Sequence, residues 1–272
     1  MKQAFITAIL VLGIVVLGAW VWLRWFEYHS LYYPERDVTT TPARFQVRYQ
    51  EVQFVAPDGV SLAGWWIPAN RPCATVVYCS GNAGNIGHRA HLAPEFYRRG
   101  FNLLLWDYRG YGQSSGRPSE KGLYADATAA FDAAEALSGK LPVMVYGHSI
   151  GAAVAIQVAC ERPVAGLVVE AGFASAADLA RRRFPRLPSD RLLSVSYDAA
   201  ARAMTLSGLP KLFGHSLDDD VIPFQSGRIL HGAATAPKTF AILAGDHNHA
   251  SWFSPGAPGN AELEAFLARF KP

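Results

Sequence analysis

Residues 143–160 read VMVYGHSIGAAVAIQVAC, and this stretch decides the fold. Its first four residues have the apolar character of a buried strand, and the residues after position 151 have the alanine-rich character of a helix. Between them, residues 147–151 (GHSIG) form a Gly-x-Ser-x-Gly turn. Such a turn lifts the serine hydroxyl out at the top of a sheet, and its glycines let helix and strand approach without a Cβ clash. The stretch therefore predicts an α/β fold with Ser149 as a nucleophile.

Short apolar runs alternate with helical stretches on both sides of this turn. Runs 47–55 and 61–67 flank the sequence PDG (57–59) and predict an opening antiparallel hairpin. Continuous apolar runs suit strands buried on both faces of a sheet. The sequence thus predicts a mostly parallel, eight-stranded sheet with helices on both faces. Further strands are expected at 74–79, 102–106, 143–146, 164–169, 209–213 and 239–243, and helices at 89–99, 123–137, 150–160, 224–230 and 261–270.

One interval is longer than a single crossover helix needs. About 40 residues separate the strand ending at Val169 from the strand starting at Leu209. We expect an extra helical element at 192–206, placed over the carboxyl ends of the strands, where open α/β sheets hold their ligands. This cap region covers about 175–207 and contains a basic cluster between Arg181 and Arg191.

The first segment differs in kind from the rest. No charge interrupts residues 3–23, and about 20 helical residues at about 1.5 Å each span about 30 Å, the thickness of the hydrocarbon layer. A cleaved signal peptide is the alternative, but bulky residues follow Ala19 where a processing site needs small ones. We therefore expect an uncleaved, single-pass transmembrane anchor. Three tryptophans mark its far end, at the level of the headgroups: Trp20, Trp22 and Trp25.

Composition and charge narrow the function classes. The net charge of +3 comes from 25 Lys+Arg against 22 Asp+Glu spread along the chain, so no broad basic footprint for nucleic acid exists. The three cysteines, Cys73, Cys79 and Cys160, have no metal-ligand spacing, and an odd number cannot complete a disulfide framework. We therefore predict no nucleic-acid partner, no metal and no cofactor.

A serine nucleophile needs a base within hydrogen-bond reach and an acid that holds this base in the right tautomer. The loop after strand 209–213 contains three consecutive acids, Asp218, Asp219 and Asp220, and the loop after strand 239–243 contains His247 and His249. The order serine, acid, histidine is the one that accompanies a Gly-x-Ser-x-Gly turn. Spacing alone leaves the choice open among the three acids and between the two histidines.

The oxyanion formed by serine attack on a carbonyl needs preorganised N–H donors. The residue after the nucleophile, Ile150, offers one backbone N–H. The second is expected from residues 80–85 (SGNAGN), whose small side chains let the backbone approach a ligand. We place this second donor at Asn82.

Five motifs together resemble the α/β-hydrolase superfamily: YCSGNAGNIGHR (78–89), DYRGYGQSSGRPSEKGLYAD (107–126), GHSIG (147–151), GHSLDDDVIPF (214–224) and GDHNH (245–249). More narrowly, the chain from Val47 onward is similar to N-terminally membrane-anchored serine hydrolases related to the abhydrolase-domain protein depalmitoylases. In that family a proline follows the triad acid after four residues, which selects Asp219 through Pro223. An asparagine follows the catalytic histidine, which selects His247 through Asn248.

The chain departs from the family pattern at three positions. Ser80 stands where the family usually has histidine, Asp246 where a small residue is usual, and His249 where an aspartate is usual. The carboxylate of Asp246 either raises the basicity of His247 or faces water.

These observations predict an anchor at 1–27, a connector at 28–44 and an α/β-hydrolase catalytic domain at 45–272. The expected function is cleavage of ester or thioester bonds in small or lipid-like acyl substrates. The alternatives are a serine peptidase or amidase, and a catalytically silent, membrane-tethered binding protein. We expect the bacterial inner membrane, with the catalytic domain outside the cytoplasm, although Lys2 on one side and Arg24 on the other leave the orientation nearly balanced. The oligomeric state stays open.

Overall fold

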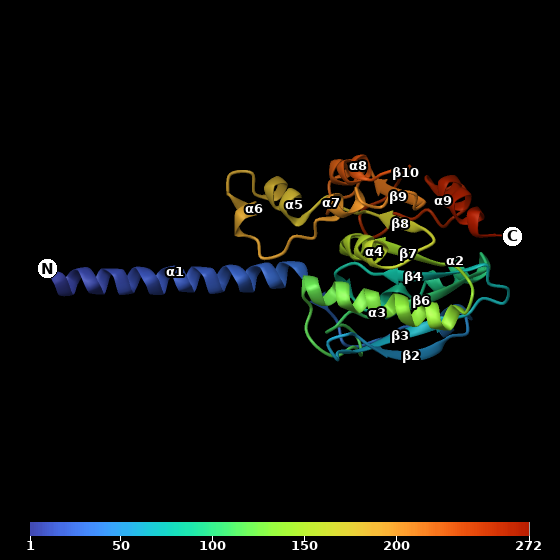
Figure 1. Ribbon diagram of the computed structural model, residues 1–272, viewed down its shortest axis with the longest axis horizontal. Coiled ribbons are helices and arrows are strands. Elements are labelled where there is room, and N and C mark those ends of the chain that lie inside the picture. Colours follow the sequence, from blue (N-terminus) through green and yellow to red (C-terminus); the bar gives the residue numbers. More distant parts are fainter. Residues whose placement is uncertain (272) are drawn as a thin grey trace. The chain divides into compact units, whose positions relative to one another are not determined.

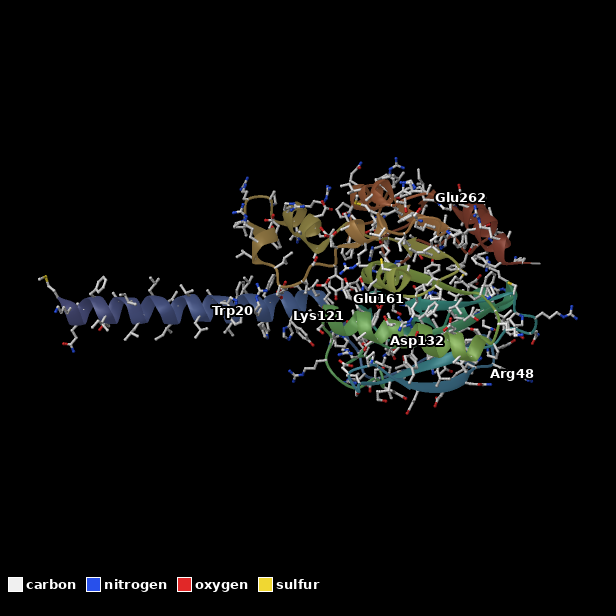
Figure 2. The ribbon with its side chains drawn as sticks, viewed as in Figure 1. Trp20, Arg48, Lys121, Asp132, Glu161 and Glu262 are labelled. Carbon is white, nitrogen blue, oxygen red and sulfur yellow. The ribbon has the colours of Figure 1, made fainter. Side chains whose placement is uncertain are left out.

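The computed structural model describes residues 1–271, and the chain divides into two compact units, residues 1–33 and residues 34 onward. The first unit is helix α1 (Lys2–Leu31), which is long and apolar enough to cross a membrane. Figure 2 shows side chains, Trp20 among them, standing out along this helix. Part of the segment predicted as a connector, 28–31, continues the helix instead. No proline or glycine interrupts it there, and an ion pair of 2.7 Å between Arg24 and Glu27 supports its last turns.

The second unit is built on an eight-stranded sheet with the strand order β10-β9-β8-β7-β4-β6-β3-β2 (Figure 1). Neighbouring strands are parallel except in the pairs β2/β3 and β3/β6. The predicted sheet is therefore confirmed. Its strands are β2 (Gln50–Val55), β3 (Ser61–Ile67), β4 (Ala74–Cys79), β6 (Phe101–Trp106), β7 (Val143–His148), β8 (Leu167–Glu170), β9 (Lys211–Ser216) and β10 (Lys238–Leu243); two-residue strands β1 (Tyr33–Pro34) and β5 (Ala83–Gly84) lie outside it.

Helices cover both faces of this sheet. Alternate strand residues such as Val76 and Tyr146 form a buried cluster with α2 (Leu92–Arg98) and α9 (Asn260–Leu267). The residues between them point to the opposite face, where the remaining long helices pack against the strands. These are α3 (Glu120–Ser138), α4 (Ile150–Glu161) and α8 (Phe224–Ala233).

Three 3-10 turns lie in the described part of this unit: η1 (Pro42–Phe45), η2 (Ile86–Arg89) and η3 (Ala268–Phe270). The second of them shortens the helix expected at 89–99, which begins only at Leu92. Asn85 caps η2, because its side-chain oxygen accepts a hydrogen bond from the N–H of Gly87.

The cap region contains three short helices, so the single helix expected at 192–206 was wrong. They are α5 (Ala176–Arg183), α6 (Ser189–Leu192) and α7 (Ala199–Ala203). A tertiary contact breaks the expected helix, because the Glu120 carboxylate accepts the backbone N–H groups of Ser196 and Tyr197, each at 2.7 Å. Helix α5 starts shortly after the carboxyl end of β8, whereas α7 packs against α4 and α8.

Candidate active site

Ser149 occupies a strained turn between β7 and α4. Its backbone has φ +57° and ψ −123°, a conformation that side-chain-bearing residues rarely adopt. Close packing enforces the turn: a Cβ on Gly147 would lie 2.2 Å from the carbonyl oxygen of Gly151, and a Cβ on Gly151 would lie 2.1 Å from that of Cys79. The N–H of Ser149 also donates to the carbonyl of Glu170, at 2.9 Å, which ties the turn to β8.

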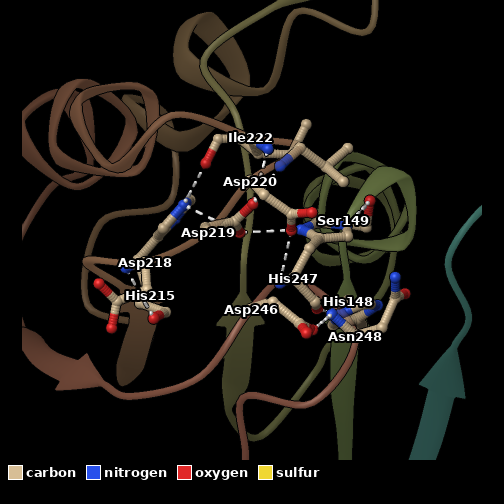
Figure 3. A network of polar contacts seen from close by, with 12 residues as sticks. His148, Ser149, His215, Asp218, Asp219, Asp220, Ile222, Asp246, His247 and Asn248 are labelled. Carbon is tan, nitrogen blue, oxygen red and sulfur yellow. Dashed lines mark hydrogen bonds and ion pairs between the residues drawn. The ribbon is translucent and has the colours of Figure 1, made fainter.

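A continuous hydrogen-bonded chain joins Ser149, His247 and Asp219 (Figure 3). The distance from Ser149 Oγ to His247 Nε2 is 3.0 Å, and the distance from His247 Nδ1 to Asp219 Oδ2 is 2.8 Å. Because a carboxylate only accepts, His247 Nδ1 carries the proton and Nε2 is free to accept from the serine hydroxyl. All three side chains are almost fully buried. This tautomer is the one a general base requires.

Asp219 receives more hydrogen bonds than the one from His247. Its Oδ1 accepts the backbone N–H groups of Val221 and Ile222, at 3.0 and 2.7 Å. Its Oδ2 also lies 3.4 Å from His215 Nε2, which donates to the carbonyl of Ile222 at 2.9 Å. Burial alone would raise the pKa of Asp219, but the hydrogen bonds from His215, His247 and Ile222 outweigh it and hold the pKa below its ordinary value. The carboxyl is therefore ionised at neutral pH.

The neighbouring acids take other roles in the same loop. Asp220 accepts the backbone N–H of His247 at 3.2 Å, so it holds the histidine loop rather than the imidazole. Asp218 is exposed, and its own N–H donates to the hydroxyl of Ser216. The alternative histidine, His249, is also exposed, and its Nδ1 pairs with Asp246 at 2.8 Å. Asp246 thus pairs with His249, and its side chain is about half exposed.

The two predicted oxyanion donors follow neighbouring strands, β7 and β4. Ile150 is the first residue of α4, where a backbone N–H has no intrahelical acceptor. Asn82 lies just after β4, the strand next to β7. Its carbonyl accepts the hydroxyl of Tyr111 at 2.7 Å, which fixes the orientation of that part of the loop. A backbone N–H at each position is the donor type that an oxyanion needs.

His148 contacts the site more closely than the sequence suggested. Its ring centroid lies 5.1 Å from that of His247, and its Nε2 donates to the carbonyl of His247 at 3.2 Å. Burial lowers the pKa of His148 to about 3, so the ring is neutral and adds no charge beside the base. A histidine directly before the nucleophile is the only sequence signal for this contact.

A buried carboxyl lies behind the serine turn. Glu170 accepts a hydrogen bond from the Tyr146 hydroxyl, which in turn accepts one of 2.8 Å from Trp252 Nε1. Burial raises the pKa of Glu170 to about 7. The network connects β8, β7 and the loop after His247, and no sequence motif indicated it. Within residues 1–271, no group of three or more His, Cys, Asp or Glu side chains is placed to hold a metal ion.

Comparisons with known proteins agree with this architecture. A family model described as serine aminopeptidase, S33, matches residues 70–194. An uncharacterized protein of Mycobacterium tuberculosis is 34% identical, over 89% of this chain and 86% of its own length. The alpha/beta hydrolase domain-containing protein WAV2 of Arabidopsis thaliana is 28% identical, over 96% and 93% of the two chains. An esterase of Pyrococcus furiosus shares the fold with a TM-score of 0.69 at 18% identity, covering 88% of this chain and 98% of its own.

Proposed function

The chain belongs to the α/β-hydrolase superfamily, and we propose that it is a serine hydrolase that cleaves ester or thioester bonds of acyl substrates. The observation that carries this proposal is the hydrogen-bonded chain from Asp219 through His247 to Ser149. Ser149 Oγ attacks the acyl carbonyl while His247 Nε2 takes its proton, and Asp219 stabilises the imidazolium that forms. The protonated His247 then protonates the leaving group. A water molecule, deprotonated by the same histidine, hydrolyses the acyl-enzyme.

The backbone N–H groups of Asn82 and Ile150 stabilise the oxyanion in this proposal. The strained backbone at Ser149 supports it, because a serine in such a strand-to-helix turn is accompanied by an oxyanion donor on the next residue. Such donors act mainly in the transition state, where the negative charge develops.

We further propose that α1 anchors the enzyme in a membrane as a single span. A 30-residue apolar helix with exposed side chains supports this role. The anchor would hold the catalytic unit near acyl substrates that partition into the bilayer. A bacterial inner membrane, with the catalytic unit outside the cytoplasm, remains our proposal for the location.

Peptide or amide hydrolysis is the second candidate. The description of the matching family model, serine aminopeptidase, is the observation that favours it. The same serine chemistry serves both classes, so only substrates separate them. A panel of acyl esters, acyl thioesters and aminoacyl amides, compared by kcat/KM, decides between the two.

Covalent labelling of Ser149 tests the proposal directly. Wild type should react with a fluorophosphonate probe and hydrolyse acyl esters, and Ser149→Ala should lose the label and up to about 10⁶-fold in turnover. Ser254→Ala, at an exposed serine before α9, is the matched control and should behave as wild type. Undiminished labelling of Ser149→Ala would refute the nucleophile. A wild type without label or turnover would favour the silent binding protein.

A further inference from the structure

The segment that follows α1 is built into the loop that carries Asn82. We name residues 34–38 the exit segment and residues 80–88 the oxyanion loop; both belong to the second compact unit. The N–H of Glu35 donates to the carbonyl of Gly84 at 3.2 Å. The two segments are separated by about 50 residues of sequence, so this contact is a product of the tertiary fold.

One buried side chain makes most of this connection. Asn85 is 4% exposed, and its Nδ2 donates to the carbonyls of Glu35 and Asp37, at 3.2 and 2.9 Å. Its Oδ1 accepts the N–H of Gly87 at 2.9 Å. The amide therefore uses its donors on the exit segment and its acceptor on the oxyanion loop. Losing the donors would remove both hydrogen bonds that this side chain gives to the exit segment.

The 107–115 loop contacts both the exit segment and the oxyanion loop. The carbonyl of Glu35 also accepts the N–H of Gly112, at 2.9 Å, and Arg36 Nη1 donates to the carbonyl of Ser114 at 2.6 Å. From the same 107–115 loop, the Tyr111 hydroxyl holds the carbonyl of Asn82. The 107–115 loop therefore binds the Asn82 carbonyl, next to the proposed oxyanion donor, and the exit segment hydrogen-bonds to this same loop.

We infer that Asn85 is a positioning residue, which sets the place of the Asn82 N–H by joining the exit segment to the oxyanion loop. This inference rests on the proposed function, because it assigns Asn82 to the oxyanion. Donors of this kind work only when held close to their productive geometry, and a misplacement of about 1 Å costs about 10²-fold in rate. The exit segment is accordingly part of the active-site scaffold and not a passive linker.

Point variants of the full-length chain in detergent micelles test the inference. Asn85→Ala removes every hydrogen bond of the side chain. Asn85→Asp keeps the acceptor for Gly87, but it replaces the donors to the exit segment with a carboxylate oxygen that the two carbonyls repel. Both should lower kcat on a short soluble ester by about 10-fold to 10²-fold with little change in KM, since the oxyanion exists only after attack. Fluorophosphonate labelling should slow in parallel.

Asn102→Ala is the matched control. Asn102 is likewise 4% exposed and bonded through both ends of its amide, to the N–H of Ala69 and the hydroxyl of Thr75. It lies near the amino end of β6, whereas the serine turn follows the carboxyl end of the parallel strand β7. A purely structural loss there should lower the melting temperature and leave kcat unchanged.

The outcomes separate the two proposals. Wild-type kcat in Asn85→Asp, with wild type itself active and labelled, would overturn the positioning role alone. An equal loss of kcat in Asn102→Ala would also overturn it, because the effect would then be one of general stability. A wild type that takes no label and hydrolyses no ester would overturn the proposed function together with this inference.

Discussion

Asp219 differs from its two acidic neighbours in what its carboxylate contacts. It faces His247 and His215 and accepts two backbone N–H groups, whereas Asp220 accepts one backbone N–H and Asp218 is exposed. A carboxylate that holds Nδ1–H keeps the imidazole in the tautomer that accepts the serine proton. The three acids should therefore respond differently to the same substitution.

We predict that Asp219→Asn lowers turnover by about 10⁴-fold, because an amide can donate to Nδ1 and stabilise the wrong tautomer of His247. Asp218→Asn and Asp220→Asn should cost far less, and steady-state ester hydrolysis by the three variants measures this. A larger loss in Asp218→Asn or Asp220→Asn would show that another acid holds the histidine.

At the scale of elements, the cap presents apolar side chains to solvent. Leu187 is 58% exposed, Leu192 44% and Met204 61%. The helix α5 that begins this region follows the carboxyl end of β8, whose neighbour β7 ends at the serine turn. The exposed apolar side chains of Leu187 and Leu192, in the segment after α5, suit an acyl chain better than a hydrated leaving group.

We predict that affinity for acyl esters rises with chain length, by about 0.8 kcal/mol for each CH₂ buried, until the apolar surface is covered. Leu192→Ser should weaken this dependence, which a KM series over chain length measures. Leu137→Ser is the control: Leu137 is 43% exposed near the end of α3, which leads to the amino end of β7. Equal KM series for wild type and Leu192→Ser would exclude the cap residue from acyl binding.

At the scale of the whole molecule, two buried carboxyls link stability to pH. Burial raises the pKa of both Asp107 and Glu170 to about 7. The folded chain therefore binds their protons more tightly than the unfolded chain does, and the stability from these groups is lost as pH rises toward 7. His148 acts in the opposite sense, since its low pKa in the folded chain removes stability as pH falls below its ordinary range.

We predict that wild type loses stability relative to Glu170→Gln as pH rises from 4.5 to 7. The difference in the free energy of unfolding should change by up to roughly 3 kcal/mol, which urea titrations across this range measure. Comparing the two chains at each pH cancels the contributions of Asp107 and His148. Asp132→Asn, at a half-exposed surface acid, should show no such change. A difference independent of pH would mean that Glu170 stays ionised.

Removal of α1, the proposed anchor, separates the roles of the two compact units. We predict that deleting residues 1–27 leaves hydrolysis of a short soluble ester nearly unchanged, because the exit segment and the site residues all remain. Activity on acyl substrates in vesicles should fall, since the local concentration at the membrane is lost. The measurement is the ratio of full-length to truncated activity on each substrate. Equal ratios would leave the anchor with a role in location only.

The sequence by itself determined the features that depend on local patterns. Apolar runs marked the strands of the central sheet, and GHSIG between a strand and a helix marked the turn at Ser149. The uncharged stretch 3–23 likewise marked a helix of membrane-spanning length. Each of these signals arises within a short window, where side-chain periodicity and turn chemistry act.

Only the tertiary structure decided what meets across long sequence separations. Spacing left three acids and two histidines open, and family resemblance rather than periodicity selected among them. The cap helix is broken because Glu120 accepts a backbone N–H within it. His215, on β9, lies beside Asp219 as a second histidine. Asn85 donates to a carbonyl of the exit segment, which is far from it in sequence. Such contacts form because buried carbonyls, N–H groups and carboxylates must find partners wherever the fold brings them. No local window contains that information.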